Sequence, residues 1–306
     1  MSVPAALLPV RPLRIAILGT RGVPPAYGGF ETFAAELSTR LVARGHDVSV
    51  YCRPGPTTPA TEEKIGGEAE QWCGVRRIVV PAAMGSKYLE TVSHSFFSAV
   101  DALRRNFDVV LVCNAANAFV LPLLRSARIA VIINVDGIER KRRKWNVLGR
   151  AVYAIGETFA VTFASRVVAD ADVIARYYEG RHGLKPSMIP YGAEFPAEPD
   201  SDVLDRLGVK AKRYVLYVSR FEPENNPLEV MQAYQRIVET GGGQEVPPLV
   251  MVGSASYAPE LERELRARAG EQVLLPGALY GPDYRTLQRN ALIYIQATEV
   301  GGTHPA

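Results

Sequence analysis

Cysteine is scarce in this sequence, and neither sign of charge dominates. The three cysteines among 306 residues, Cys52, Cys73 and Cys113, have neither the spacing of a metal site nor the even number of a disulfide framework. We therefore expect reduced thiols in a cytoplasmic protein with no bound metal. The net charge of +3 is too small to predict a nucleic-acid partner.

Long apolar runs are also missing. A membrane-spanning helix needs about 20 consecutive apolar residues, and the nearest candidate, 109–124, is interrupted by Asn114, Asn117 and Pro122. The start of the chain has no basic segment before its short apolar stretch, so it does not match a signal peptide. We interpret residues 1–12 as a disordered extension.

The apolar residues, 47% of the chain, form short runs that alternate with helical patterns. This alternation predicts parallel sheets with right-handed crossovers, and 306 residues exceed one typical α/β domain. A proline- and acid-rich stretch, 191–199, is typical of a linker. We therefore predict an α/β protein with two doubly wound, Rossmann-like domains, 13–195 and 196–306.

Individual elements follow from the periodicity of the apolar residues. Residues 54–67 predict an exposed loop, because they are rich in Pro, Thr, Glu and Gly. The predicted strands are 14–18, 48–52, 76–81, 107–113, 129–135, 166–169, 214–218, 249–252, 273–275 and 292–296, and residues 187–190 are expected to close the first domain. The predicted helices are 32–43, 88–104, 118–124, 151–163, 171–178, 228–239, 259–269 and 282–290.

A glycine-rich loop, 19–31, joins the first strand to the first helix. Glycines let backbone N–H groups turn toward a ligand, and the helix N-terminus adds a partial positive charge. The loop therefore predicts an anion site, with Gly28 and Gly29 at the start of the helix. An ordinary βα connection built from turn residues remains the alternative.

The same loop is a poor dinucleotide fingerprint. That motif needs the spacing G-x-G-x-x-G, whereas Pro24 and Pro25 here remove two amide donors. The second strand ends at Cys52-Arg53, with no acid for a ribose hydroxyl. Because Arg53 is able to meet a 2′-phosphate, an NAD(P)-dependent oxidoreductase stays open as an alternative function.

Two segments carry a resemblance to a known family. Ile17-Leu18-Gly19-Thr20-Arg21-Gly22-Val23-Pro24 and Tyr27-Gly28-Gly29-Phe30-Glu31-Thr32 resemble the retaining GT-B glycosyltransferases of family 4, in particular the bacterial branch with rhamnosyltransferases of surface-polysaccharide synthesis. The resemblance implies two Rossmann-like domains facing across a cleft, with the Gly-Gly pair under the diphosphate of a nucleotide sugar. It also implies a glycan or lipid-linked acceptor and no cofactor or metal.

The resemblance extends to the second predicted domain. Arg220 follows the domain's first strand, where it can pair with a bound phosphate, and in the family an Arg here neutralises the donor diphosphate. Many relatives have Lys where this chain has Asn225. We keep Asn225 as a donor-binding candidate and expect Arg220 and backbone amides to carry more of the charge. The alternative for Arg220 is a surface pair with a loop Glu.

The end of the sequence, 298–306, matches the start of the family's donor-site motif. By resemblance, Glu299 accepts hydrogen bonds from donor-sugar hydroxyls, and the N–H groups around Gly301, Gly302 and Thr303 face the sugar and the diphosphate. The family's second glutamate would follow Ala306. We therefore interpret the chain as truncated, with an incomplete second domain, and expect it to have little or no transfer activity.

Candidates on the acceptor side come from the first domain. Asp136 ends a predicted strand and is our candidate for orienting the acceptor, with an Asp-Gly turn as the alternative. Tyr27 and His94 are further candidates, and a packing role is the alternative for His94. We expect Glu157 to face solvent, as is common for a helical Glu, with a position facing the cleft as the alternative, and we expect His182 to be isolated.

The dense basic run is the last feature with a functional reading. Arg142, Arg143 and Lys144 lie beside Trp145 and would suit anionic lipid head groups or a lipid-linked pyrophosphate. A solvated loop is the alternative. The sequence thus predicts a cytoplasmic retaining glycosyltransferase, peripheral on the inner face of the plasma membrane, with Asp136, Arg220 and Glu299 at the reaction centre. A non-catalytic binding fragment stays open as a further alternative.

Overall fold

The computed structural model describes residues 11–25, 28–54, 68–83, 87–138, 140, 146–192, 201–241, 246–255 and 259–299. These residues form two compact units, one within Met1–Ala193 and one within Glu194–Val300. The predicted domain boundary falls among residues 193–200, outside the described residues, and most of the predicted N-terminal extension lies outside them too. Both therefore stay predictions.

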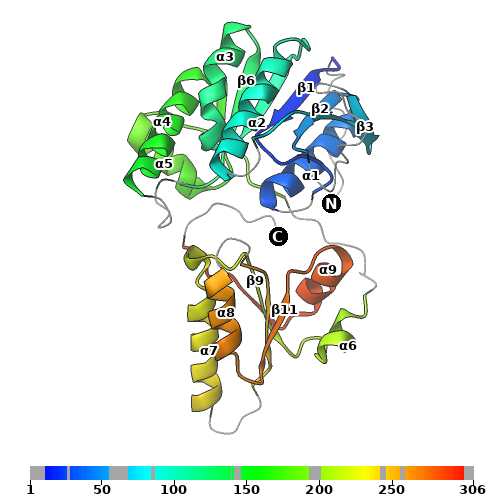
Figure 1. The fold of residues 1–306 in the computed structure, drawn as a ribbon, viewed down its shortest axis with the longest axis vertical. Helices are drawn as coiled ribbons and strands as arrows, with labels where there is room; N and C mark the ends of the chain where they lie inside the picture. The colour runs from blue at the N-terminus through cyan, green and yellow to red at the C-terminus, as the bar shows by residue number, and fades with distance from the viewer. Residues whose placement is uncertain are drawn as a thin grey trace. The chain divides into compact units, whose positions relative to one another are not determined.

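The first unit is built on a sheet with the strand order β3-β4-β2-β1-β5-β6-β7-β8 (Figure 1). Every strand pair except β3 with β4 is parallel. The strands are β1 (Arg14–Leu18), β2 (Asp47–Cys52), β3 (Glu68–Trp72), β4 (Val75–Val79), β5 (Val109–Cys113), β6 (Ala130–Val135), β7 (Arg166–Ala169) and β8 (Ser187–Met188). The helices are α1 (Gly29–Ala43), α2 (Lys87–Ala102), the 3-10 helix η1 (Ala115–Val120), α3 (Leu121–Ser126), α4 (Val147–Phe163) and α5 (Asp172–His182).

Alternate residues of the central strand β1 are buried on opposite faces of this sheet. Ile15 and Ile17 pack in the core on the α1 side, whereas Ala16 and Leu18 pack in the core formed with α2 to α5. A strand buried on both faces reads as one continuous apolar run, which is why the sequence predicts it well. The chain leaves β1 toward β2 on one side and reaches β5 on the other, so the carboxyl ends of β1 and β5 form a topological switch point.

One edge of the first sheet departs from the prediction of purely parallel sheets. β3 pairs antiparallel with β4, and the two strands are joined by Cys73 and Gly74. Both connecting residues have positive φ, 49° and 78°, as a type I′ hairpin turn requires. The parallel prediction is wrong here because Cys-Gly is a weak turn signal in a sequence read as alternating strands and helices.

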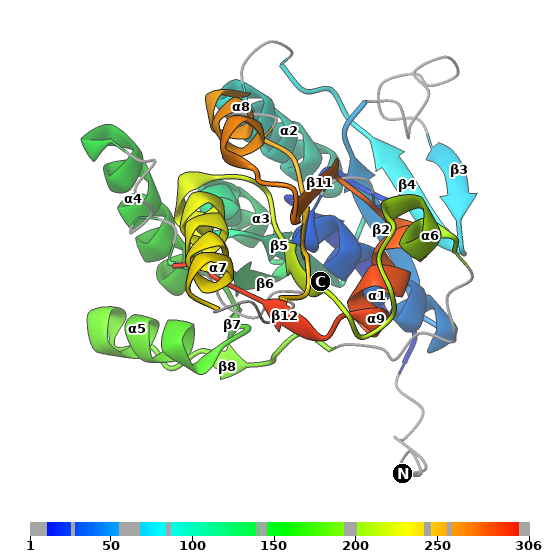
Figure 2. The same ribbon diagram turned by 90° about the horizontal axis from the view of Figure 1, so that it is seen from below.

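The second unit contains a parallel sheet with the strand order β11-β10-β9-β12. Helices α7 and α8 lie side by side on one face, as Figures 1 and 2 both show, and α6 and α9 pack on the other. The switch point of this sheet lies between β9 and β12. Its strands are β9 (Val215–Val218), β10 (Leu249–Val252), β11 (Val273–Gly277) and β12 (Ile293–Ile295), and its helices are α6 (Val203–Leu207), the 3-10 helix η3 (Pro223–Asn225), α7 (Pro227–Thr240), α8 (Pro259–Arg268) and α9 (Gly281–Asn290).

The α/β fold class with doubly wound sheets is confirmed in both units. The bounds differ mainly at helix starts: α1 begins at Gly29 and α4 at Val147, each a turn or so earlier than predicted. The early start of α4 has a local cause, because Oδ1 of Asn146 accepts a hydrogen bond from the Gly149 N–H at 2.9 Å. No helix in the described part of the chain is long and apolar enough to cross a membrane.

Candidate functional site

The loop after β1 passes very close to neighbouring strands. Gly19 and Gly22 have φ values of +89° and +115°, which favour glycine. A Cβ atom on Gly19 would meet the carbonyl oxygen of Cys113 and lie 2.7 Å from Nδ2 of Asn117, and one on Gly22 would lie 2.5 Å from Sγ of Cys52. These two glycines are therefore needed for close packing of the loop at the switch point.

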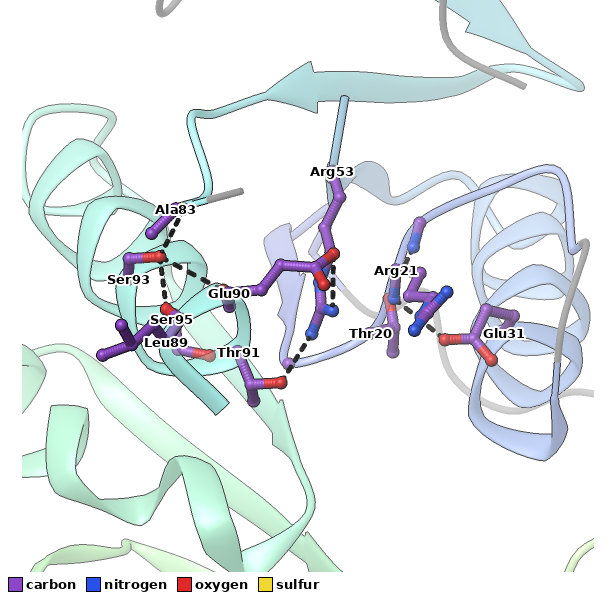
Figure 3. A network of polar contacts seen from close by, with 12 residues as sticks. Thr20, Arg21, Glu31, Arg53, Ala83, Leu89, Glu90, Thr91, Ser93 and Ser95 are labelled. Carbon is purple, nitrogen blue, oxygen red and sulfur yellow. Dashed lines mark hydrogen bonds and ion pairs between the residues drawn. The ribbon is translucent and has the colours of Figure 1, made fainter. Parts of the chain in front are cut away.

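A buried carboxylate ties this loop to the start of α1. Oε1 of Glu31 accepts a hydrogen bond from the Arg21 N–H at 2.9 Å, and Glu31 is buried although it lies in the first helical turn (Figure 3). The Gly28 carbonyl accepts hydrogen bonds from the N–H groups of Glu31 and Thr32. Gly29 and Phe30 then supply first-turn N–H groups, which have no intrahelical acceptor. The predicted anion site thus has donors available, with Glu31 beside them.

A cluster of polar side chains connects the end of β2 to α2. The Arg53 guanidinium, with its side chain 10% exposed, donates to Oε1 of Glu90 at 3.2 Å and to Oγ1 of Thr91 at 3.3 Å (Figure 3). Burial lowers the pKa of Arg53, and the charge of Glu90 opposes that shift. The sequence identified Arg53 at a strand end but gave no signal for Glu90 and Thr91, which come from a helix 37 and 38 positions later.

His94 is fully buried on α2, one turn beyond Glu90. Burial, reinforced by the positive charge of Arg53, lowers the pKa of His94 to about 3. The next residue, Ser95, donates to Oδ1 of Asn117, whose Nδ2 donates to the Cys113 carbonyl. His94 is therefore a neutral packing residue with no surface for an acceptor, and the acceptor-side hypothesis for it is corrected.

The neutral His94 predicts a pH effect on stability. Below a pKa of 6.5 the unfolded chain binds a proton at this residue, whereas the folded chain does not until about pH 3, so stability falls as pH falls. We expect His94 to account for about 2 kcal/mol of stability lost between pH 7 and pH 5. Urea unfolding at both pH values should show a loss smaller by that amount in His94→Gln, and equal losses in the two proteins would contradict this assignment.

Asp136 follows β6 at the same edge of the first sheet. Its neighbour Asn134 donates from Nδ2 to the hydroxyl of Tyr191 at 3.0 Å. Burial raises the pKa of Tyr191, and the charge of Asp136 adds to the shift. Burial also raises the pKa of Cys113, to which the charges of both Glu31 and Asp136 contribute. The switch-point edge therefore brings two carboxylates, suited to sugar hydroxyls, near the end of β5.

Glu157 differs from its prediction. It is 3% exposed, and Oε2 accepts a hydrogen bond from the Tyr177 hydroxyl at 2.9 Å. Arg181 and His182 approach the same oxygen at 3.4 and 3.6 Å, and Arg140 lies 3.8 Å from it. The expectations of a solvent-facing Glu157 and an isolated His182 are wrong, because α5 folds back onto α4 and brings its last residues to this carboxylate.

In the second unit, two loops flank the switch point. Arg220 follows β9 with its side chain 48% exposed, and its Nη1 lies 3.6 Å from Oε1 of Glu222. Glu299 follows β12, and its N–H donates to the Glu224 carbonyl at 2.9 Å. Asn225 is only 9% exposed. The structure therefore brings together the loops of three predicted donor residues, Arg220, Asn225 and Glu299.

The remaining predicted site residues lie outside the described residues and stay predictions: Tyr27, Arg142, Arg143, Lys144, Gly301, Gly302 and Thr303. Within the part of the chain that the structure describes, no three His, Cys, Asp or Glu side chains are grouped to hold a metal ion.

Comparisons with known proteins identify the fold. A family model described as "Glycosyl transferase 4-like domain" matches residues 28–192, whereas a comparison with curated protein sequences gave no match. The chain is similar to a sucrose-phosphate synthase from Thermosynechococcus elongatus (17% identity, TM-score 0.70, 94% of this chain and 75% of that chain covered). It is also similar to the catalytic domain of starch synthase IV from Arabidopsis thaliana, bound to ADP and acarbose (13% identity, TM-score 0.69, 94% of this chain and 78% of that chain covered).

A third similar structure is a UDP-N-acetylglucosamine 2-epimerase from Rickettsia bellii (17% identity, TM-score 0.57, 93% of this chain and 74% of that chain covered). These likenesses confirm the GT-B fold. Since the similar structures have names that denote different reactions, the fold by itself leaves the reaction open.

Proposed function

The chain belongs to the glycosyl transferase 4-like family, and from that premise we propose that it transfers a sugar from a nucleoside-diphosphate donor to a glycan or lipid-linked acceptor. Transfer would proceed with retention and without a metal or cofactor. Rhamnose on a dTDP donor is the proposed sugar, and cell-surface polysaccharide synthesis in the cytoplasm is the proposed setting.

One observation carries this proposal: the convergence of the Arg220 and Glu299 loops at the switch point of the second sheet. Ligands of open α/β sheets bind at such points, outside the carboxyl ends of the strands. The guanidinium on one loop suits a diphosphate, and the carboxylate on the other loop suits sugar hydroxyls. The two groups together match a molecule that carries both, namely a nucleotide sugar.

The proposed reaction needs no nucleophile from the protein. As the bond between the sugar and the diphosphate breaks, Arg220 and the loop amides stabilise the charge on the leaving diphosphate. The leaving phosphate takes the proton of the acceptor hydroxyl on the same face of the sugar. Asp136 would hold the acceptor by accepting hydrogen bonds from the acceptor's hydroxyl groups.

Peripheral contact with a membrane is part of the proposal. Leu89, Val92 and Phe96 lie on one side of α2 and are 62%, 49% and 49% exposed. We expect the double variant Leu89→Ser, Phe96→Ser to bind phosphatidylglycerol vesicles about tenfold more weakly in co-sedimentation, because apolar contact is lost. Ile237→Ser, which changes a 57% exposed residue of α7, is the matched control, and equal binding by all three proteins would exclude contact through α2.

Calorimetric titration with dTDP, UDP, GDP and NADPH tests the function. We expect saturable binding of one nucleoside diphosphate and none of NADPH, and a ligand at about a hundredfold its Kd should also raise stability by about 2.7 kcal/mol. Binding of NADPH alone would reject the proposal in favour of an oxidoreductase. Incubation of the bound nucleotide's sugar conjugate without acceptor separates transfer from epimerisation, since only an epimerase would convert the sugar.

A further inference from the structure

The carboxamide of Asn225 makes a hydrogen bond at each of its two ends inside the second unit. Nδ2 donates to the Arg220 carbonyl at 2.6 Å, and Oδ1 accepts from Oγ1 of Thr298 at 3.1 Å. One carboxamide therefore connects the loop after β9 with the loop after β12. These two bonds indicate that Asn225 has a structural role inside the protein, in addition to its predicted place in the donor site.

The neighbours of Asn225 continue the same connection. Nδ2 of Asn226 donates to the Ala297 carbonyl at 2.8 Å, and the Glu299 N–H donates to the Glu224 carbonyl at 2.9 Å. Residues 224, 225 and 226 thus bond to residues 299, 298 and 297 in turn. The two loops run antiparallel and are joined by three consecutive bonds, two of which use an asparagine side chain.

The backbone of the loop after β9 is also held by a side chain of β9 itself. The Tyr217 hydroxyl donates to the Asn225 carbonyl at 2.7 Å and accepts from Oγ of Ser219 at 2.6 Å. Burial raises the pKa of Tyr217, so this hydroxyl stays a donor. Asn226 has a left-handed conformation, φ 55° and ψ 43°, which asparagine tolerates better than most residues. Its side-chain bond compensates for that backbone conformation.

We infer that Asn225 and Asn226 are positioning residues, which hold Arg220 and Glu299 at a fixed separation so that the diphosphate and the sugar of the donor are bound together. This inference rests on the proposed function. An amide at position 225 supplies no charge, so the loop relies on geometry where a lysine would add a second cation. A nucleotide sugar engages both loops, whereas a free nucleoside diphosphate engages mainly the Arg220 loop.

Asn226→Gly is the test variant, because glycine keeps the left-handed backbone and removes only the side-chain bond to Ala297. We expect about tenfold weaker binding of the sugar conjugate, dTDP-rhamnose, UDP-glucose or GDP-mannose, and less than threefold weaker binding of the corresponding free diphosphate. Thr298→Val, which removes the donor to Asn225, should act the same way. Asn290→Ala is the control, since Nδ2 of Asn290 donates to the Thr286 carbonyl within α9.

A second measurement tests the positioning role of Asn225 and Asn226 without any ligand. Hydrogen exchange of the Glu299 amide should accelerate about tenfold in Asn226→Gly and in Thr298→Val, and stay unchanged in Asn290→Ala. Unchanged exchange at Glu299, or equal weakening of diphosphate and sugar conjugate, would overturn the positioning role. If the unaltered chain binds no nucleotide at all, the proposed function fails, and the exchange rates still decide whether the asparagines join the two loops.

Discussion

Gly19→Ala is expected to lose at least about 3 kcal/mol of stability, a large fraction of the about 5–15 kcal/mol that a folded domain typically has. Two penalties combine at this position. The φ of +89° strains any residue with a side chain, and the new Cβ would collide with the Cys113 carbonyl and with Asn117. Both obstacles belong to β5 and the turn after it, so relief would require separating the two strands at the switch point. Urea unfolding followed by circular dichroism measures the loss.

Gly45→Ala is the matched control for that prediction. Gly45 has nearly the same φ, +87°, but a Cβ there would have nothing within 4 Å. It should therefore show only the backbone strain, about 1–2 kcal/mol. The difference between the two variants measures the close approach of the loop to β5. Equal losses would mean that the approach contributes nothing and that φ alone explains the need for glycine.

Arg220→Ala is expected to weaken nucleoside-diphosphate binding about a hundredfold. A charged hydrogen-bonded contact contributes about 1.5–3 kcal/mol, and the effect should reach the upper end because residue 225 is an uncharged amide. The Arg220 side chain is 48% exposed, with Nη1 3.6 Å from Oε1 of Glu222, so its guanidinium is accessible to a phosphate. Calorimetric titration with the diphosphate that the unaltered chain binds gives the ratio of the two Kd values.

Arg263→Ala separates a local contact from a general loss of positive charge. Arg263 lies on α8, is 73% exposed at its side chain and pairs with Glu260 at 2.8 Å. Its removal changes the net charge by the same amount as Arg220→Ala and should leave the Kd unchanged. A similar loss in both variants would show that Arg220 acts only through overall charge, and no loss in either would remove it from the donor site.

The sequence predicts those elements of the fold whose patterns are local. β1 and β5 are continuous apolar runs because both faces of the sheet are covered, and the glycines at 19 and 22 indicate the loop between β1 and α1. The positions of Arg220 and Glu299 follow from the rule that ligands bind at the carboxyl ends of parallel strands. For these features, the neighbouring residues contain the necessary information.

Other features depend on partners distant in the chain. In the sequence, Asn225 stands out only because many relatives have a lysine at this position. Its hydrogen-bond partner Thr298 is 73 positions away in the chain, so the sequence gives no indication of that contact. The burial of Glu157 depends on Tyr177, Arg181 and His182, which α5 brings back onto α4. A helical Glu is most often exposed to solvent, so the burial of Glu157 becomes visible only when the second helix is in place.

The hairpin at one edge of the first sheet has a further consequence, for self-association. An edge strand has unpaired N–H and C=O groups that can pair with any other extended chain. A long, hydrophobic edge strand therefore favours edge-to-edge aggregation. The outer strand here, β3, is only five residues long, and its register with β4 shifts between Ala69 and Trp72, which makes it a poor template for a second copy. At the opposite edge, β8 is only two residues long and offers little to pair with. Among the described strands, both borders of this large sheet are thus protected against edge-to-edge aggregation.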